Sequence, residues 1–330
     1  MTKSQIETIH SAPLIQGFTL TQSASSMIKT GIADALYSQS LSLTQLAKET
    51  QLSLKNLARF LRLLKLQNLV QKTGAYYTLT PSSAPLARKH PESITYSTLM
   101  HEHILYLSWQ ELPYCLQDHR LGFEKKFNSP LYEYLKKTPE QLEIFKGWMK
   151  ESHRDWIIPI LNQFNFNHFN TIIDIGGSEG HLCQHLLHQY PQLKANLIDD
   201  PMVLKTVKNP YPNRLFLSPG SIFEPPPIQG DIYILSRVLL NWSDEMALKI
   251  LNSIYSQMPP SSQLLIIDFI NDDSNPQSMS PLVDINLMVL FGTQTRSLGE
   301  FSRLLTQSQF QVSEVLTHPS TVSLIVATPN

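Results

Sequence analysis

The second half of the chain alternates short apolar runs with helix-forming segments, and this alternation restricts the fold more than any other feature. After Phe169, five strand candidates are separated mostly by helical stretches. They are Thr171 to Ile175, Leu193 to Ile198, Leu215 to Ser218, Ile232 to Ser236 and Leu264 to Phe269. Such alternation predicts a parallel sheet with helices on both faces.

The last two strand candidates depart from this alternation. Phe310 to Leu316 and Thr321 to Ala327 are joined only by His318, Pro319 and Ser320, a spacing that suits an antiparallel hairpin. The sequence therefore predicts a seven-stranded α/β sheet of the Rossmann-like type with a terminal antiparallel hairpin. This arrangement is more typical of methyltransferases than of dehydrogenases.

The first part of the chain has a different pattern. Helix-like runs at 31–36, 44–50 and 54–66 precede strand candidates at 69–72 and 76–80, with Gly74 between the two strands. Three helices and a hairpin predict a winged helix. We expect a winged-helix domain at 1–92, a helical linker and substrate-pocket segment at 93–165, and a Rossmann-like domain at 166–330. Four prolines are expected to divide the middle segment into separate helices: Pro113, Pro130, Pro139 and Pro159.

The third predicted helix carries Lys55, Arg59 and Arg62 on one face, so DNA binding by a metabolite-sensing regulator is one hypothesis. The formal net charge of -1 and the pI near 6.8 provide no basic field for a polyanion. The sequence favours a small-molecule ligand, no nucleic acid, and a winged helix used for dimer packing.

The spacing of the cysteines and the hydropathy of the chain restrict the kinds of site and the cellular compartment that we expect. Cys115 and Cys183 lie far apart, outside any CxxC pair or cluster of metal ligands, so we expect neither a disulfide framework nor a metal site. No stretch approaches eighteen uninterrupted apolar residues, and the first residues lack the apolar core of a signal peptide. We expect a cytoplasmic protein that does not span a membrane.

A glycine-rich turn follows the first strand of the predicted sheet. Residues 173–180 read IDIGGSEG, in which glycines let the backbone approach a ligand at the carboxyl end of a strand. The turn lacks the GxGxxG spacing of nicotinamide dinucleotide folds. At the end of the next strand, Asp199 can accept the two hydroxyls of a ribose. The alternative is that Asp199 and Asp200 merely cap a helix.

With these motifs the chain resembles the family of S-adenosylmethionine-dependent O-methyltransferases. This family includes caffeic acid and hydroxyindole methyltransferases and many bacterial natural-product tailoring enzymes. The similarity runs from about Gly31 to the C-terminus. The matching segments are GIADAL at 31–36, LTP at 79–81, DIGG at 174–177, DDP at 199–201, WSDE at 242–245, and Arg296, Ser297, Glu300 and Phe301.

The resemblance implies an N-terminal winged-helix dimerisation domain, a homodimer, and a class I methyltransferase domain. It also implies S-adenosylmethionine as cofactor, with S-adenosylhomocysteine as product. The predicted cofactor-binding residues are Asp174, Gly176, Asp199, Asp200, Ser221, Ile222, Phe223, Ser236, Arg237 and Trp242. The predicted substrate-binding residues are Met149, Trp109, Leu240, Asn241, Asn286, Leu287 and Leu290.

The sequence departs from the family at the catalytic positions. Members that deprotonate a phenol use the His of a His-Asp-Trp motif between two acids, whereas Leu240 stands at the His position here. Asp268 matches one acid, Thr295 replaces the other, and Ser221 replaces an acid beside adenine. Because leucine cannot take a proton, the usual base is absent at this position.

The Leu-Leu-Asn-Trp form at 239–242 resembles a subgroup that tailors anthracyclines and related aromatic polyketides. This resemblance implies methyl transfer by proximity, or a cofactor-binding enzyme that does not methylate, such as a decarboxylase, hydroxylase, dehydratase or pericyclase. The predicted catalytic residues are Asp268, His103 and His153, because either histidine has the intrinsic pKa of a base. A lone helical histidine is more often structural. The sequence identifies neither the substrate nor the acceptor atom.

Overall fold

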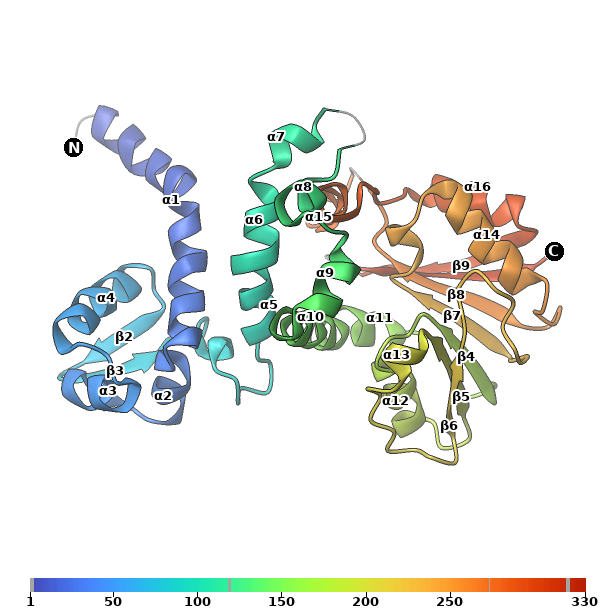
Figure 1. The fold of residues 1–330 in the computed structure, drawn as a ribbon, viewed down its shortest axis with the longest axis horizontal. Helices are drawn as coiled ribbons and strands as arrows, with labels where there is room; N and C mark the ends of the chain where they lie inside the picture. Colours follow the sequence, from blue (N-terminus) through green and yellow to red (C-terminus); the bar gives the residue numbers. More distant parts are fainter. Residues whose placement is uncertain (1–2, 118–119, 273, 319–320) are drawn as a thin grey trace. The chain divides into compact units, whose positions relative to one another are not determined.

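The structure is a computed structural model that describes residues 3–117, 120–272, 274–318 and 321–330, with only the backbone for residues 3–15. The chain forms two compact units (Figure 1). The first combines Met1–Ser108 with Tyr132–Glu151, and the second combines Trp109–Leu131 with Ser152–Asn330. The division into three segments at 92/93 and 165/166 stays a prediction.

The first unit contains the predicted winged helix. After the long helix α1 (Lys3–Lys29), the elements are α2 (Ile32–Ser38), β1 (Leu41–Ser42), α3 (Leu43–Thr50), α4 (Leu54–Leu66), β2 (Val70–Thr73) and β3 (Tyr76–Leu79). The three strands form an antiparallel sheet in the order β1-β3-β2. Sequence reasoning missed β1, because two residues are too few to show a strand period.

Helix α4 is amphipathic for a simple reason of spacing. Leu57, Leu61 and Leu64 recur at i, i+4 and i+7 and are buried in the core of the winged helix. Lys55, Arg59 and Arg62 are all exposed. The basic residues are therefore a solvated surface in this protomer.

The next helices fill the middle of the chain. They are η1 (Ala84–Leu86), α5 (Thr95–Met100), η2 (His101–Leu105), α6 (Tyr106–Trp109), α7 (Leu112–Cys115), α8 (Gly122–Phe127), α9 (Leu131–Lys137), α10 (Pro139–Ser152), η3 (His153–Ile157) and α11 (Ile158–Leu161). Pro159 lies in the first turn of α11, as expected for a proline that divides two helices. The π-helical turn η3 connects α10 to α11 without a loop, because a widened turn accommodates a residue that lacks an N–H and crowds the preceding carbonyls.

The second unit is built on the predicted seven-stranded sheet, in the order β6-β5-β4-β7-β8-β10-β9. The strands are β4 (Thr171–Ile175), β5 (Lys194–Asp199), β6 (Leu215–Pro219), β7 (Ile232–Ser236), β8 (Gln263–Asp268), β9 (Phe310–Leu316) and β10 (Ser323–Pro329). The first five are parallel, and β10 is antiparallel to both β8 and β9. The terminal hairpin is thus confirmed, although Pro319 and Ser320 of its predicted turn lie outside the described residues.

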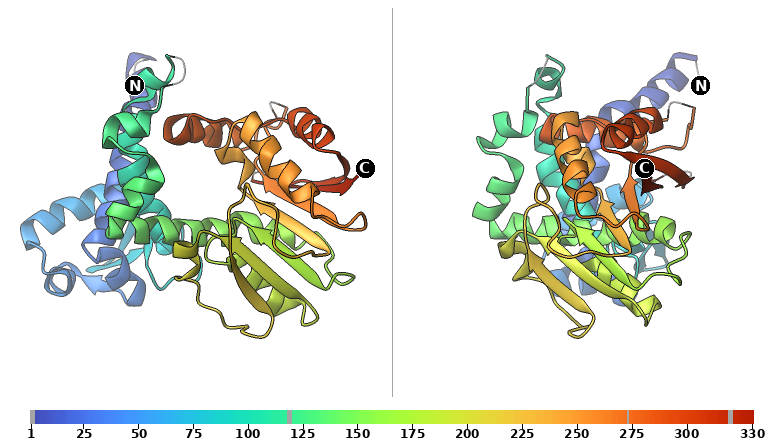
Figure 2. Two further views of the ribbon diagram at one scale, coloured as in Figure 1. Left: turned by 45° about the vertical axis from the view of Figure 1, so that its right-hand side comes forward. Right: turned by 90° about the vertical axis from the view of Figure 1, so that its right-hand side faces the viewer.

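Helices cover both faces of this sheet (Figure 2). One face packs against α11, α12 (His181–Gln189), α13 (Pro201–Leu204) and α15 (Ser280–Phe291). The other packs against α14 (Asp244–Tyr255) and α16 (Leu298–Gln307). Alternate strand residues enter the two cores, as Ile172 and Ile173 do, which explains why the strands read as continuous apolar runs.

Within the part of the chain that the structure describes, none of the helices has the length and apolar character needed to cross a membrane.

The first helix of the middle segment, α5, depends on a carboxylate from α10. Glu151 is 6% exposed, and its Oε1 and Oε2 accept hydrogen bonds from the backbone N–H groups of Tyr96 (3.0 Å) and Ser97 (2.7 Å). The Ser97 hydroxyl donates a further bond of 2.7 Å to Oε2. No side chain at the N-cap position of α5 takes over this function.

We therefore expect Glu151→Gln to lower the free energy of unfolding by about 1–3 kcal/mol, measured by urea denaturation, because a charged acceptor is lost and an amide N–H faces backbone donors. Glu143→Gln is the matched control, since Glu143 lies on the same helix with 75% of its side chain exposed. The control should change stability by less than about 0.5 kcal/mol. Equal effects of the two substitutions contradict the capping role.

Candidate functional site

The carboxyl ends of four neighbouring strands form one edge of the parallel sheet. The chain runs from β4 outward through β5 to β6, and then returns to the other side of β4 to form β7. Such a reversal of strand order creates a crevice that binds ligands in open α/β sheets. Gly176, Asp199, Ser221 and Ser236, all predicted to contact the cofactor, end or closely follow these four strands.

The glycine-rich turn after β4 has a backbone that most side chains disfavour. Gly176, Ser178 and Gly180 have φ values of +73°, +55° and +72°. At Gly177 a side chain would collide with the Asp174 carboxyl and with Leu197. The turn therefore needs glycine both for its left-handed conformation and for its close packing.

Asp199 ties this turn to the next strand. Its Oδ2 accepts a hydrogen bond of 2.8 Å from the Ser178 backbone N–H, and its Oδ1 accepts one of 2.7 Å from Asp200. Desolvation raises the pKa of this carboxyl. Each oxygen keeps a further acceptor site, so Asp199 can still receive two hydroxyls.

Asp200 has a structural function in addition to its predicted contact with the cofactor. Its carboxylate accepts a 2.7 Å hydrogen bond from Met202 and caps α13. The helix-capping interpretation therefore applies to Asp200, whereas Asp199 caps no helix in the described residues. The contact of either residue with the cofactor stays a prediction.

Asp174 lies completely buried beneath the glycine turn. The Cys183 thiol of α12 donates to its Oδ2 over 3.2 Å, while its Oδ1 has no hydrogen-bond partner among the described residues. Burial raises the pKa of Asp174 to about 7. Sequence reasoning missed the contact with Cys183, which only the return of α12 over β4 creates.

Apolar side chains line the turn on the side that faces residues 221–242. Ile222 and Val238 both pack closely against Gly176. A Cβ atom at this glycine would lie 3.4 Å from Ile222 and 3.1 Å from Val238. Phe223 packs edge-on against Trp242, with ring centroids 4.8 Å apart. This arrangement brings three residues predicted from sequence, Ile222, Phe223 and Trp242, to one region and suits a flat, partly apolar group such as adenine.

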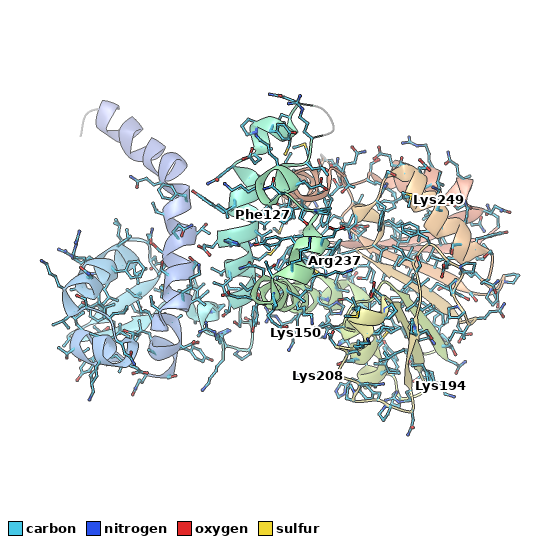
Figure 3. All side chains as sticks on the ribbon, in the orientation of Figure 1. Phe127, Lys150, Lys194, Lys208, Arg237 and Lys249 are labelled. Carbon is cyan, nitrogen blue, oxygen red and sulfur yellow. The ribbon has the colours of Figure 1, made fainter. Side chains whose placement is uncertain are left out.

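Arg237 follows the last residue of β7 and is labelled in Figure 3. Its φ of +54° is strained for a residue with a side chain, and its Nη1 donates a 2.8 Å hydrogen bond to the Ser152 hydroxyl. The adjacent His153 is buried. Desolvation first, and then the nearby Arg237 and His181, hold the pKa of His153 well below its usual range.

The turn that carries Leu240, η4 (Leu239–Asn241), is held from below by Arg296. This arginine is 3% exposed and donates to the carbonyls of Leu239 (2.8 Å) and Trp242 (2.6 Å) and to the Asp244 carboxylate (2.9 Å). Leu240 is itself buried in the core that includes Leu287 of α15. The position of the expected base is thus occupied by an apolar side chain on a rigid turn.

Asp268 ends β8 and is fully buried. Burial raises its pKa to about 7, although backbone N–H groups of Phe269 and Leu240 and the Arg296 guanidinium favour the charged form. Asp268 therefore lies beside the η4 turn, where sequence reasoning placed an acid. Its predicted catalytic role stays a prediction.

Helix α15 gathers predicted substrate residues. The Trp109 indole donates a 2.7 Å hydrogen bond to Asn286 Oδ1, although the two residues are far apart in sequence. Leu287 and Leu290 are buried on the same helix. Asn241 donates to the Arg237 carbonyl over 3.2 Å, which uses its amide locally.

An acid that sequence reasoning did not single out lies beside Thr295. Asp284 Oδ1 accepts hydrogen bonds from the Thr295 backbone N–H (2.6 Å) and hydroxyl (2.7 Å). Thr295, which stands where family members carry an acid, thus binds the neighbouring acid Asp284. The signal in the sequence was a single carboxylate on a largely apolar helix.

The remaining predicted residues, Met149 and His103, belong to the first unit, on α10 and η2. The geometry of the second unit does not include them, and their roles stay predictions. No group of three or more potential metal ligands occurs among the residues for which coordinates are described.

Comparison with known proteins gives matches along most of the chain. Residues 109–311 match the model of the O-methyltransferase domain, and residues 12–89 match that of the O-methyltransferase dimerisation domain. A phenazine O-methyltransferase, PhzM of Lysobacter antibioticus, is 28% identical over 322 residues, covering 96% of this chain and 94% of that protein.

Two further matches agree with the first. The 3-amino-4-hydroxybenzoate 4-O-methyltransferase of Streptomyces cremeus is 27% identical, covering 96% of this chain and 88% of that protein. The crystal structure of LaPhzM covers both chains completely with a TM-score of 0.89 and 28% identity. The chain therefore belongs to the O-methyltransferase family, as an enzyme that uses S-adenosylmethionine and carries the family's dimerisation domain.

Proposed function

We propose that this enzyme transfers the methyl group of S-adenosylmethionine to an oxygen of a small aromatic or polyketide-like natural product. The relatives named above are O-methyltransferases for a phenazine and a hydroxybenzoate, so the enzyme is of the natural-product tailoring kind. The observation that carries the proposal for the acceptor is the Trp109–Asn286 hydrogen bond, which joins an aromatic ring and an amide to the apolar helix segment that contains Leu287 and Leu290. A flat apolar substrate with a few polar atoms is complementary to such a combination of groups.

The mechanism that we propose is alignment without a general base at position 240. Methyl transfer from a sulfonium is an in-line displacement, and orientation alone can supply about 7–11 kcal/mol of the barrier. Leu240 is buried, and burial lowers the basicity of His153. An acceptor that is already ionised at neutral pH makes a strong base unnecessary.

We also propose that the enzyme is a homodimer that binds no nucleic acid. Apolar side chains remain exposed in the first unit, among them Phe18 and Leu20 of α1 and Leu66 of α4, which is 83% exposed. Exposed apolar surface of this extent on the dimerisation domain suits burial against a second copy.

Asp199 gives the first test of the cofactor site. Asp199→Asn keeps one acceptor oxygen for the turn but removes the charge that strengthens bonds to the ribose hydroxyls. We expect about 10-fold to 100-fold weaker binding of S-adenosylhomocysteine by isothermal titration, since hydrogen bonds to charged groups contribute about 1.5–3 kcal/mol. Asp200→Asn tests the neighbouring cap in the same assay. Unchanged affinity in Asp199→Asn removes Asp199 from the cofactor site.

The pH dependence of the rate tests whether the reaction proceeds without a base on the enzyme. With a series of hydroxybenzoates of graded acidity, we expect the rate of methylation to rise with pH and to level off at the pKa of each phenol, because only the anion reacts. S-adenosylhomocysteine formation and the mass gain of one methyl group report the reaction. An inflection that stays at one pH for all phenols indicates a base on the enzyme. Cofactor binding without methylation of any acceptor favours the non-methylating alternative.

A restored base should change that pattern. Leu240→His combined with Asn241→Asp introduces an imidazole and a carboxylate to orient it on the same rigid turn. We expect the double variant to gain activity toward weakly acidic phenols at neutral pH, by about 10-fold or more. Leu240→Gln with Asn241→Asp is the matched control, since it adds polarity without a base and should gain nothing.

Asp268 gives a prediction on pH and stability. Burial raises its folded-state pKa from 3.8 to about 7, so the stability that its protonated form provides is complete below the unfolded-state pKa and is lost as pH rises toward 7. Asp268→Asn should therefore raise the thermal midpoint at about pH 8, by a few degrees, and change it much less at about pH 4. A variant that is less stable at both pH values contradicts this sign.

A further inference from the structure

His153 is a buried histidine with one ring nitrogen that has no hydrogen-bond partner among the described residues. It begins the π-helical turn η3 and is 8% exposed, and this nitrogen is its Nε2. The ring of His181, the first residue of α12, lies 6.2 Å away between centroids. A buried polar atom without a partner costs free energy unless a ligand or water satisfies it.

The three groups that act electrostatically on His153 all oppose its protonation. Arg237 at the end of β7 and His181 and His185 on α12 are the groups that face it, and together with burial they lower its pKa. Two acids also interact with members of this cluster: Glu179 lies 3.6 Å from His181 Nε2, and the buried Asp268 interacts electrostatically with Arg237. On its own turn, Arg154 and Asp155 pair with each other. The surroundings of His153 are therefore complementary to an anion.

The strand order shows which part of the cofactor reaches this cluster. The proposed ribose and adenine contacts, Asp199 and Ile222 with Phe223, lie at the ends of β5 and β6, on one side of β4. An extended ligand that begins there and crosses the glycine turn continues toward β7, the strand that ends beside Arg237. For S-adenosylmethionine this second half is the amino-acid part, whose carboxylate is the only anion of the molecule.

We propose that His153 and Arg237 receive the carboxylate of the cofactor's amino-acid half, and that His153 takes up a proton from solvent when this carboxylate binds. The inference rests on the proposed cofactor site, and it adds that binding of the cofactor is coupled to protonation of His153. In a site of low dielectric, an anion next to an imidazole favours the charged ring and outweighs the repulsion by Arg237 and His181. The carboxylate then accepts a hydrogen bond from the protonated Nε2, the atom that has no partner among the described residues.

The sign of the linkage follows from this. His153 has a low pKa in the free enzyme and a higher one in the complex, so binding consumes a proton at any pH between the two values. Affinity for the cofactor should fall as pH rises through the higher value. Asp174 and Asp199 contribute in the opposite direction, because a nearby cationic ammonium or sulfonium group promotes release of their protons. The informative quantity is therefore the difference between the unaltered enzyme and the His153 variant in the number of protons taken up on binding.

Isothermal titration with S-adenosylhomocysteine in buffers of different ionisation enthalpy, near pH 7, counts the protons exchanged. We expect His153→Gln to take up fewer protons than the unaltered enzyme, by up to about one per protomer, and to bind roughly 10-fold more weakly. 5′-Methylthioadenosine, which lacks the amino-acid half, should give the same proton count with both proteins. His185→Gln is the matched control, since His185 Nε2 already pairs with Asn162 over 3.0 Å.

Two results overturn the inference while leaving methyl transfer intact. One is an unchanged proton count in His153→Gln, and the other is a change of equal size with 5′-methylthioadenosine. Failure of the unaltered enzyme to bind either ligand instead contradicts the cofactor site itself. If thermal unfolding shows that His153→Gln does not fold, His153→Asn provides the same test, because its shorter amide cannot carry the charge either.

Discussion

The hydrogen bond from the Ser178 backbone to the Asp199 carboxylate is the contact on which the crevice of the proposed cofactor site depends. It joins the turn after β4 to the end of β5, and so fixes the crevice at the point where strand order reverses. The turn can approach Asp199 because Gly176 and Gly180 adopt left-handed backbone conformations. Gly177 contributes by packing so closely against Asp174 that a Cβ atom would not fit. The geometry of the crevice therefore follows from three glycines and one acid.

Charge is divided across this crevice in a way that suits a ligand with both signs of charge. Desolvated carboxyls, Asp174 and Asp199, lie at the ends of β4 and β5, whereas Arg237 and His153 lie at the β7 side. Burial of ionisable groups costs free energy where their hydrogen-bonding capacity is only partly satisfied, as it is at Asp174 Oδ1 and His153 Nε2. A cofactor that carries an ammonium, a sulfonium and a carboxylate can offset this cost on both sides, which couples affinity to pH.

Much of this architecture could be predicted from the sequence, and the reasons are local. The sheet strands were predicted to within two residues of their ends, because each is a short apolar run bounded by turn residues, and Gly176 and Asp199 were located by their place after such strands. The π-helical turn before Pro159, the Cys183 contact with Asp174 and the pairing of Asp284 with Thr295 left no local pattern. The two side-chain contacts depend on how a helix packs against the neighbouring strand or loop, and the π-helical turn depends on a change of backbone geometry that hydrophobic periodicity does not report.

The η4 turn is held without any contribution from the side chain of residue 240. Arg296 holds the η4 turn through the carbonyls of Leu239 and Trp242 and through Asp244, and none of these contacts involves the side chain of residue 240. Leu240 instead packs into the core with Leu287, so the substitution adds apolar burial where a histidine needs a polar partner. Arg296 and its partners, rather than the side chain at position 240, thus specify the geometry of the turn, so the proposed methyl transfer without a base at this position requires no change of the scaffold.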